Sequence, residues 1–146
     1  MKNRVLRRLI GILLCLIMVL SGTAMAFADE LDEPVTEDPI DEYQYASNAS
    51  ADISISNSGT ATFIANAKGQ IGIATKITGT CTLQKYSNGS WTKVKSVSGN
   101  TNTLSLTLNG MKANLANGRY RTHAVFKVYS GSNYETVTIN SSSVYY

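Results

Sequence analysis

The chain has 146 residues with 13 lysines and arginines, 10 acids and one histidine, a formal net charge of +3. This length suits one domain with a modest core. Its two cysteines, Cys15 and Cys81, exclude a disulfide-rich scaffold.

The first 28 residues have the layout of a signal peptide. Basic residues at positions 2–8 precede an uncharged apolar run at 9–20, and small residues follow at Ala26 and Ala28. We therefore expect cleavage after Ala28 and a secreted, extracellular protein. A retained membrane anchor is the alternative, but spanning a bilayer takes about 20 apolar residues. A lipoprotein would need Cys15 after the apolar run, whereas it lies inside the run.

Residues 29–50 are predicted to form an acidic disordered arm. Positions 29–42 hold eight acids and no base, interrupted by Pro34 and Pro39. Such a segment buries too little apolar surface to order itself. It contains no Asp-x-Asp-x-Asp-Gly loop, so no calcium site is predicted.

Residues 51–146 have the pattern of an all-β domain. The segment lacks proline and alternates apolar with polar residues between Gly- and Asn-containing breaks. Hairpin turns are expected at 68–69, 87–90 and 130–133. A turn of helix is conceivable at 111–115. The expected strands lie near 52–56, 60–66, 70–78, 80–86, 91–97, 103–109, 119–129 and 134–140.

These seven or eight strands predict an antiparallel two-sheet sandwich, with a small barrel as the alternative. The alternation at 104–108 and at Ile71, Ile73 and Ile77 is expected to give buried faces. Cys81 is expected to be a buried small hydrophobe.

Residues 115–128 contain a pattern similar to a known structural feature of β-sandwiches. Leu-Ala-Asn-Gly-Arg-Tyr, ending at Tyr120 and followed by alternating Thr122, Ala124, Phe126 and Val128, resembles the tyrosine corner of immunoglobulin-like and fibronectin type III sandwiches. Thr122 stands where those immunoglobulin domains place a cysteine. More broadly, residues 60–140 resemble small uncharacterised secreted proteins of Gram-positive bacteria, a likeness that implies no particular activity.

Catalytic and metal chemistry have little support in the sequence. The domain offers one histidine, one cysteine and two carboxylates, and alternation points Cys81 inward and His123 outward. No metal-ligand spacing and no phosphate-binding loop occur. We therefore expect no enzyme activity, no cofactor and no metal. A toxin or hydrolase acting outside the cell is an alternative that rests on secretion and small size.

A cationic, aromatic face is the candidate binding surface. After residue 50 the chain has nine lysines and arginines but two acidic residues, Asp52 and Glu135. If Phe126 faces the core, basic and aromatic side chains share the opposite sheet face. The candidate ligand-binding residues are Trp91, Lys93, Lys95, Arg119, Arg121, His123, Lys127, Tyr129 and Tyr134.

This face predicts a secreted, non-catalytic binding module for an anionic cell-surface polymer or glycan, associated with the cell wall. The alternative is a structural or protein-interaction protein that contacts another surface protein and has no small ligand. A third interpretation is that the lysines protect strand edges. Nucleic acid is not an expected partner, and no stable membrane insertion is expected after cleavage.

Overall fold

The computed structural model describes residues 43–146, so the predicted signal peptide (1–28) and the acidic segment 29–42 lie outside the described residues. The described part of the chain contains strands and no helix. In chain order the strands are β1 (Ala46–Ile55), β2 (Ala61–Gly69), β3 (Lys76–Ser87), β4 (Ser90–Thr101), β5 (Ser105–Lys112), β6 (Arg119–Ser130), β7 (Asn133–Asn140) and β8 (Val144–Tyr145).

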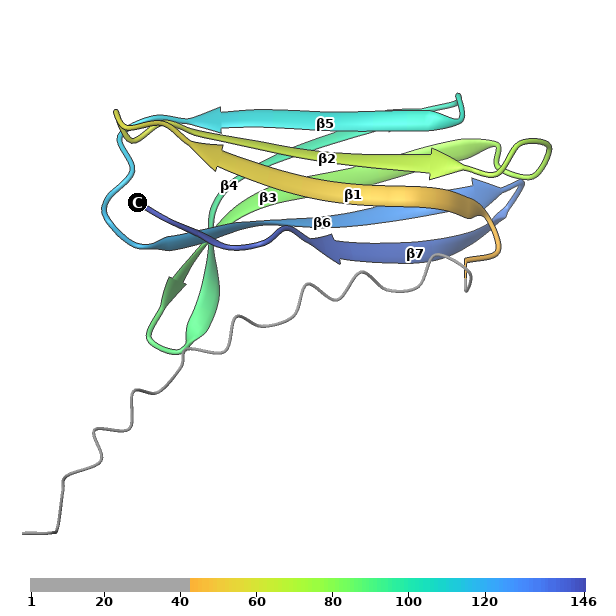
Figure 1. Ribbon diagram of the computed structural model, residues 1–146. Coiled ribbons are helices and arrows are strands. Elements are labelled where there is room, and N and C mark those ends of the chain that lie inside the picture. The colour runs from red at the N-terminus through yellow and green to blue at the C-terminus, as the bar shows by residue number, and fades with distance from the viewer. Residues whose placement is uncertain (1–42) are drawn as a thin grey trace, which may run out of the picture. The chain divides into compact units, whose positions relative to one another are not determined.

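The strands form two antiparallel sheets stacked as two layers (Figure 1). One sheet has the order β1-β2-β5 and the other β4-β3-β6-β7, with β8 paired to the first residues of β6. No strand pairing within residues 43–146 joins the two sheets. The predicted β-sandwich is therefore confirmed, and the barrel alternative is wrong.

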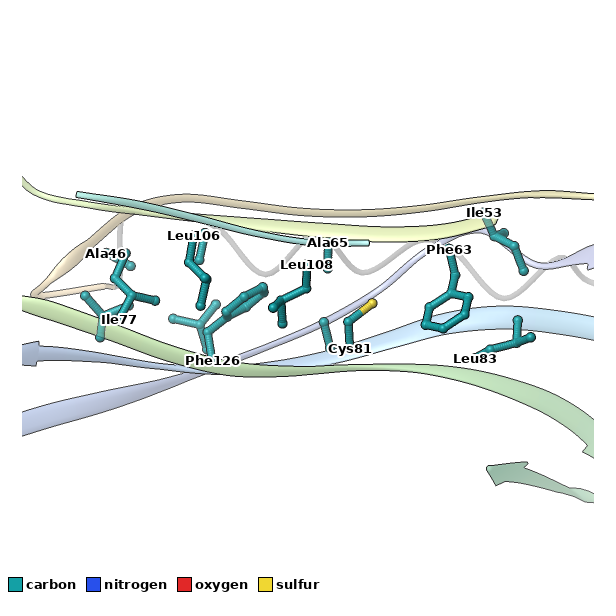
Figure 2. Packing of buried hydrophobic residues seen from close by; sticks show 14 of the residues in the cluster. Ala46, Ile53, Phe63, Ala65, Ile77, Cys81, Leu83, Leu106, Leu108 and Phe126 are labelled. Atoms are coloured by element: carbon teal, nitrogen blue, oxygen red, sulfur yellow. The ribbon is translucent and has the colours of Figure 1, made fainter. Parts of the chain in front are cut away.

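The core lies between the two layers (Figure 2). Phe63 and Leu108 project into it from the β1-β2-β5 sheet, and Leu83 and Phe126 project from the other sheet. Alternate residues point inward because successive side chains of a strand leave on opposite faces. Each such large apolar side chain contributes about 1.5–3 kcal/mol on burial. The sandwich is thus stabilised by apolar packing without a disulfide.

Strand β6 alternates regularly between buried and half-buried side chains. Every even-numbered residue of 120–128 is buried, and every odd-numbered residue of 119–129 is half-buried. Hydrogen-bonded neighbours on both sides, β3 and β7, hold the strand in this orientation. The predicted inward set from Tyr120 to Val128 is therefore confirmed.

Thr122 is the polar residue on the buried side of β6. Its hydroxyl donates to the carbonyl of Asp52 in the opposite sheet at 2.8 Å, and its amide donates to Ser141 Oγ at 2.9 Å. A buried hydroxyl needs such a partner, because leaving it unbonded costs about 1–3 kcal/mol. The hydrogen bond to Asp52 joins the two layers at the position where the family resemblance expects a cysteine.

The start of β6 is held by local polar contacts. The Tyr120 hydroxyl donates to the carbonyl of Ala116, which is the bond that defines a tyrosine corner. Gly118 and Tyr146 exchange two backbone hydrogen bonds of 2.9 and 3.0 Å. The last residues of the chain therefore continue along the edge that β8 forms with β6.

The start of β1 is held by Glu135 on β7. Its carboxylate accepts hydrogen bonds from the amides of three consecutive residues, Gln44 at 2.8 Å, Tyr45 at 2.7 Å and Ala46. Successive amides that converge on one anion form a nest. The strand consequently begins at the buried Ala46. The predicted boundary, with a disordered arm up to residue 50, is wrong for these residues.

The strand expected at 70–78 is also wrong. The amides of Ile73 and Ala74 both donate to the carbonyl of Gln70, and Gly72 adopts a φ of 79°, so the backbone turns here. Ile71 is 87% exposed as a result. Strand β3 then runs without a break from Lys76, through the position expected to separate two strands.

Gly79 lies inside β3 for a packing reason. A Cβ atom at this position would lie 2.4 Å from Cδ1 of Phe126. The glycine therefore makes room for the aromatic ring of the neighbouring strand rather than ending a strand.

The hairpin turns expected at 87–90 and 130–133 are confirmed. The hairpin turn expected at 68–69 is wrong, because β2 continues to Gly69 and β3 lies in the other sheet. The possible helical turn at 111–115 is also absent. Asn88 and Gly89 have φ values of 52° and 78°, as a two-residue turn between β3 and β4 requires. Gly131, with a φ of 62°, lies in the turn between β6 and β7. In place of a helical turn at 111–115, β5 continues to Lys112 and an irregular segment follows.

Glu135→Gln is expected to lower the free energy of unfolding by about 2 kcal/mol, because a neutral oxygen accepts the three amides more weakly than a carboxylate does. Denaturant unfolding followed by Trp91 fluorescence measures this. Asp52→Asn is the matched control, since the Asp52 carboxylate accepts the amide of its neighbour Ile53. We expect less than about 0.5 kcal/mol from the control. Equal losses in both variants would contradict the role given to Glu135.

Candidate functional site

The candidate site is the outer face of the β4-β3-β6-β7 sheet, the side turned away from the core. Strand register places five lysine and arginine side chains on it: Lys76, Lys93, Arg119, Arg121 and Lys127. The two carboxylates of residues 43–146 lie elsewhere, because Asp52 is on β1 and Glu135 pairs with the inward-facing Val128. The outer face therefore combines several positive charges with no acidic side chain from residues 43–146.

A guanidinium cluster lies at the end of this face where β6 begins. It consists of Tyr86, Trp91, Arg119, Arg121 and Tyr145. The guanidinium carbon of Arg121 is 4.3 Å from the centroid of the Trp91 ring. That of Arg119 lies 5.8–5.9 Å from the rings of Tyr86, Trp91 and Tyr145. These distances are within the range of cation–π attraction.

Side-chain acceptors orient both guanidinium groups further. Arg119 Nε donates to Ser143 Oγ at 2.8 Å, and Arg121 Nε donates to Gln84 Oε1 at 2.9 Å. Rings and acceptors together hold the planar groups in defined positions. Such groups recognise carboxylate, sulfate or phosphate oxygens through paired hydrogen bonds.

A lysine cluster lies at the other end of β6. It consists of Lys76, Lys127, Tyr129 and Tyr134. Lys127 Nζ is 4.3 Å from the centroid of the Tyr134 ring, and Lys76 Nζ is 5.5 Å from that of Tyr129. The two tyrosine rings lie 5.3 Å apart across the β6–β7 pair. This end therefore repeats the pairing of cations with aromatic rings.

A strip without lysine, arginine or carboxylate side chains separates the two clusters. The outward residues here on β3, β4 and β7 are mainly hydroxyl and amide side chains: Thr78, Thr80, Thr82, Ser96, Ser98, Asn100, Thr136, Thr138 and Asn140. A depression of about 450 Å³ lies within the strip, with Thr80, Ser98 and Lys127 among its lining residues. Its lining also includes the paired Gly79 and Gly99. The strip thus offers hydroxyl groups and a hollow next to the lysine cluster.

Strand register places eight of the nine predicted site residues on the outer face, and the exception is Lys95. A register shift between Leu83 and Gln84 places Lys93 opposite Gln84, and Lys95 opposite the inward-facing Leu83. Lys95 Nζ donates to the carbonyl of Met111 on β5 at 2.8 Å. The predicted outward position of Lys95 is wrong, because the bulge at Val94 reverses the alternation of β4.

Three residues of the clusters were missed in the sequence. Tyr86 directly precedes the hairpin turn and pairs with Trp91, so hairpin register could have revealed it. Lys76 falls within the strand wrongly expected at 70–78, whereas in the structure it is the first residue of β3. Tyr145 pairs with Arg119 through the two-residue β8, which has no sequence signal of its own.

His123 and Cys81 point to opposite faces of the sheet. His123 Nδ1 lies 2.8 Å from Asn140 Oδ1 on the outer face. Cys81 pairs with the inward-facing Ala124 and is fully buried, as expected. Burial raises the pKa of its thiol to about 11. The two side chains therefore do not form a thiol–imidazole pair.

The described part of the chain shows no metal cluster and no membrane-spanning helix. Residues 43–146 contain no group of three or more His, Cys, Asp or Glu side chains that could hold a metal ion. The same residues include no helix with the length and apolar character to cross a membrane. The chain matches no protein-family model, no curated protein and no solved structure.

The buried thiol is expected to make the domain less stable in alkaline solution. The ordinary pKa of a cysteine is 9.0, whereas the folded domain holds this proton to about pH 11. Between these values the folded state binds more protons than the unfolded state, so the free energy of unfolding falls as pH rises. The contribution of Cys81 amounts to about 2 kcal/mol by pH 11.

Unfolding in denaturant at several pH values below and above 9 measures this effect. Cys81→Ala should lose less stability than the parent over the same interval, because the titrating thiol is gone. A parallel fall in both proteins would assign the alkaline destabilisation to other groups.

Proposed function

We propose that this protein is a secreted, non-catalytic binding module for an anionic cell-surface polymer or glycan. The observation that carries the proposal is the outer face, which has five cationic side chains, no carboxylate side chain from residues 43–146, and guanidinium groups within cation–π distance of aromatic rings. Over residues 43–146, nine lysines and arginines against two carboxylates leave a formal charge of +7. This excess favours anionic partners over neutral ones.

The proposed location outside the cell rests on the predicted signal peptide and on the resemblance to secreted proteins of Gram-positive bacteria. An immunoglobulin-like classification belongs to the same proposal. It is supported by the Tyr120 corner and by the strand order β1-β2-β5 facing β4-β3-β6-β7. Cell-wall polymers rich in phosphate or acidic sugars are the partners that fit these properties.

A structural or protein-interaction role through strand edges has less support. Lys93, Lys95 and the bulge at Val94 lie on β4, which is an edge strand of its sheet. Lysines and bulges on an edge strand hinder pairing with another chain. The flat side of the sheet is therefore a better candidate for contact than its edge.

The proposal is tested by titrating the chain from residue 29 onward with heparin, a sulfated glycan, at low ionic strength. Trp91 is the only tryptophan and lies against Arg121, so its fluorescence reports on the site directly. Arg121→Gln is expected to weaken binding about 10-fold or more, because a charged hydrogen bond contributes about 1.5–3 kcal/mol. Added salt should weaken binding further.

Lys68→Gln is the matched control. It removes the same charge from an exposed position on β2, in the opposite sheet, and should change the affinity less than about 2-fold. Calorimetry measures the affinities of all variants independently of fluorescence. Equal losses for Arg121→Gln and Lys68→Gln would mean that net charge, not this face, attracts the glycan. Absence of binding at low salt would reject the proposal.

The acidic segment 29–42 requires a control of its own. Its eight acids are covalently tethered to the basic domain, and a tethered polyanion competes with a free one for cations because its effective concentration is high. Changing these acids to their amides should therefore strengthen heparin binding. Truncation must stop at residue 42, because the amides of residues 44–46 bind Glu135 and belong to the fold.

A further inference from the structure

We propose that the outer face binds a single linear polyanion lengthwise along β6, and that the guanidinium cluster and the lysine cluster are two separate contact points for it. This inference rests on the proposed function and defines the class of ligand. Lys127 lies six positions after Arg121 on the same strand. At about 3.4 Å per residue, the two contact points lie about 20 Å apart.

The spacing between the clusters is fixed by the fold. Both contain residues of β6, which is hydrogen-bonded along its length to β3 and, for most of it, to β7 or β8. The buried half of β6 is packed in the core, so the strand cannot bend or slide without breaking that packing. A ligand that contacts both clusters must therefore match a constant distance.

The surface between the clusters fits the uncharged parts of such a polymer. Thr78, Thr80 and Ser98 line the depression between β3 and β4, and no charged side chain other than Lys127 borders it. Hydroxyl groups can donate to and accept from sugar or polyol hydroxyls. The arrangement favours a chain whose anionic groups are separated by hydroxyl-bearing units over a compact multivalent anion.

Aromatic support lowers the entropic cost of binding at each end. Lysine and arginine side chains lose about 2 kcal/mol of rotamer freedom when they are fixed. Lys127 over Tyr134 and Arg121 over Trp91 are already positioned in the structure. Each cluster is thus a preorganised but small site, and a chain that reaches both gains avidity because the second contact is intramolecular.

The test is calorimetry with size-fractionated heparin fragments that are shorter or longer than about 20 Å. Fragments too short to reach both clusters should bind weakly, and longer fragments should bind about 10- to 100-fold more tightly. Lys127→Gln should remove most of this gain while changing the affinity for short fragments less than about 2-fold, since those still bind the guanidinium cluster. Lys68→Gln should leave the whole length dependence unchanged.

The comparison with Lys127→Gln is essential, because a longer fragment can bind one cluster in several overlapping positions. This raises the apparent affinity of the fragment without a second contact. That statistical gain would survive in Lys127→Gln. If the parent and Lys127→Gln show the same length dependence, or if short and long fragments bind the parent equally, the two-point proposal is overturned while the proposed function stands. If no fragment binds, the proposed function itself fails.

Discussion

The packing of one side of β6 in the core is the constraint on which both the fold and the candidate site depend. Tyr120 and Phe126 are among the largest fully buried side chains, and they come from the same strand as Arg121 and Lys127. A shift of one residue would expose the aromatic side chains and bury the cations, at a cost of several kcal/mol for each. Core packing therefore fixes the position of every outward group on this strand.

Polar contacts supplement apolar packing where the strands begin. Thr122 bonds the two layers through Asp52, and Glu135 holds the start of β1 through three amides. Both contacts join residues about 70 to 90 positions apart in the chain, so they form with the complete fold. In a domain with a single, buried cysteine, they connect the elements without a covalent crosslink.

Local patterns in the sequence were sufficient to predict most of the architecture. Alternation from Tyr120 to Val128 gave the correct orientation of β6, and the Asn88-Gly89 turn gave the correct β3–β4 hairpin. Where prediction failed at Ile71, the apolar alternation was real, but the hydrogen bonds to Gln70 turned the chain away from the sheet.

The remaining errors come from contacts that no local pattern reveals. Lys95 follows a bulge that reverses the alternation of β4, and the bulge leaves no distinctive residue type in the sequence. Ala46 belongs to β1 because Glu135, distant in sequence, accepts hydrogen bonds from its amide and from the two amides that precede it. The grouping of Arg119 with Tyr145 likewise depends on pairing between strands far apart in the chain.

The orientation of β6 can be measured directly by thiol labelling. In a Cys81→Ala background, single cysteines are placed at each position from 121 to 128, and the rate of modification of the folded protein is determined. We expect fast labelling at odd-numbered positions and protection at even-numbered positions, with protection lost in denaturant. Fast labelling at 124 and protection at 121 and 127, or equal rates throughout, would contradict the account.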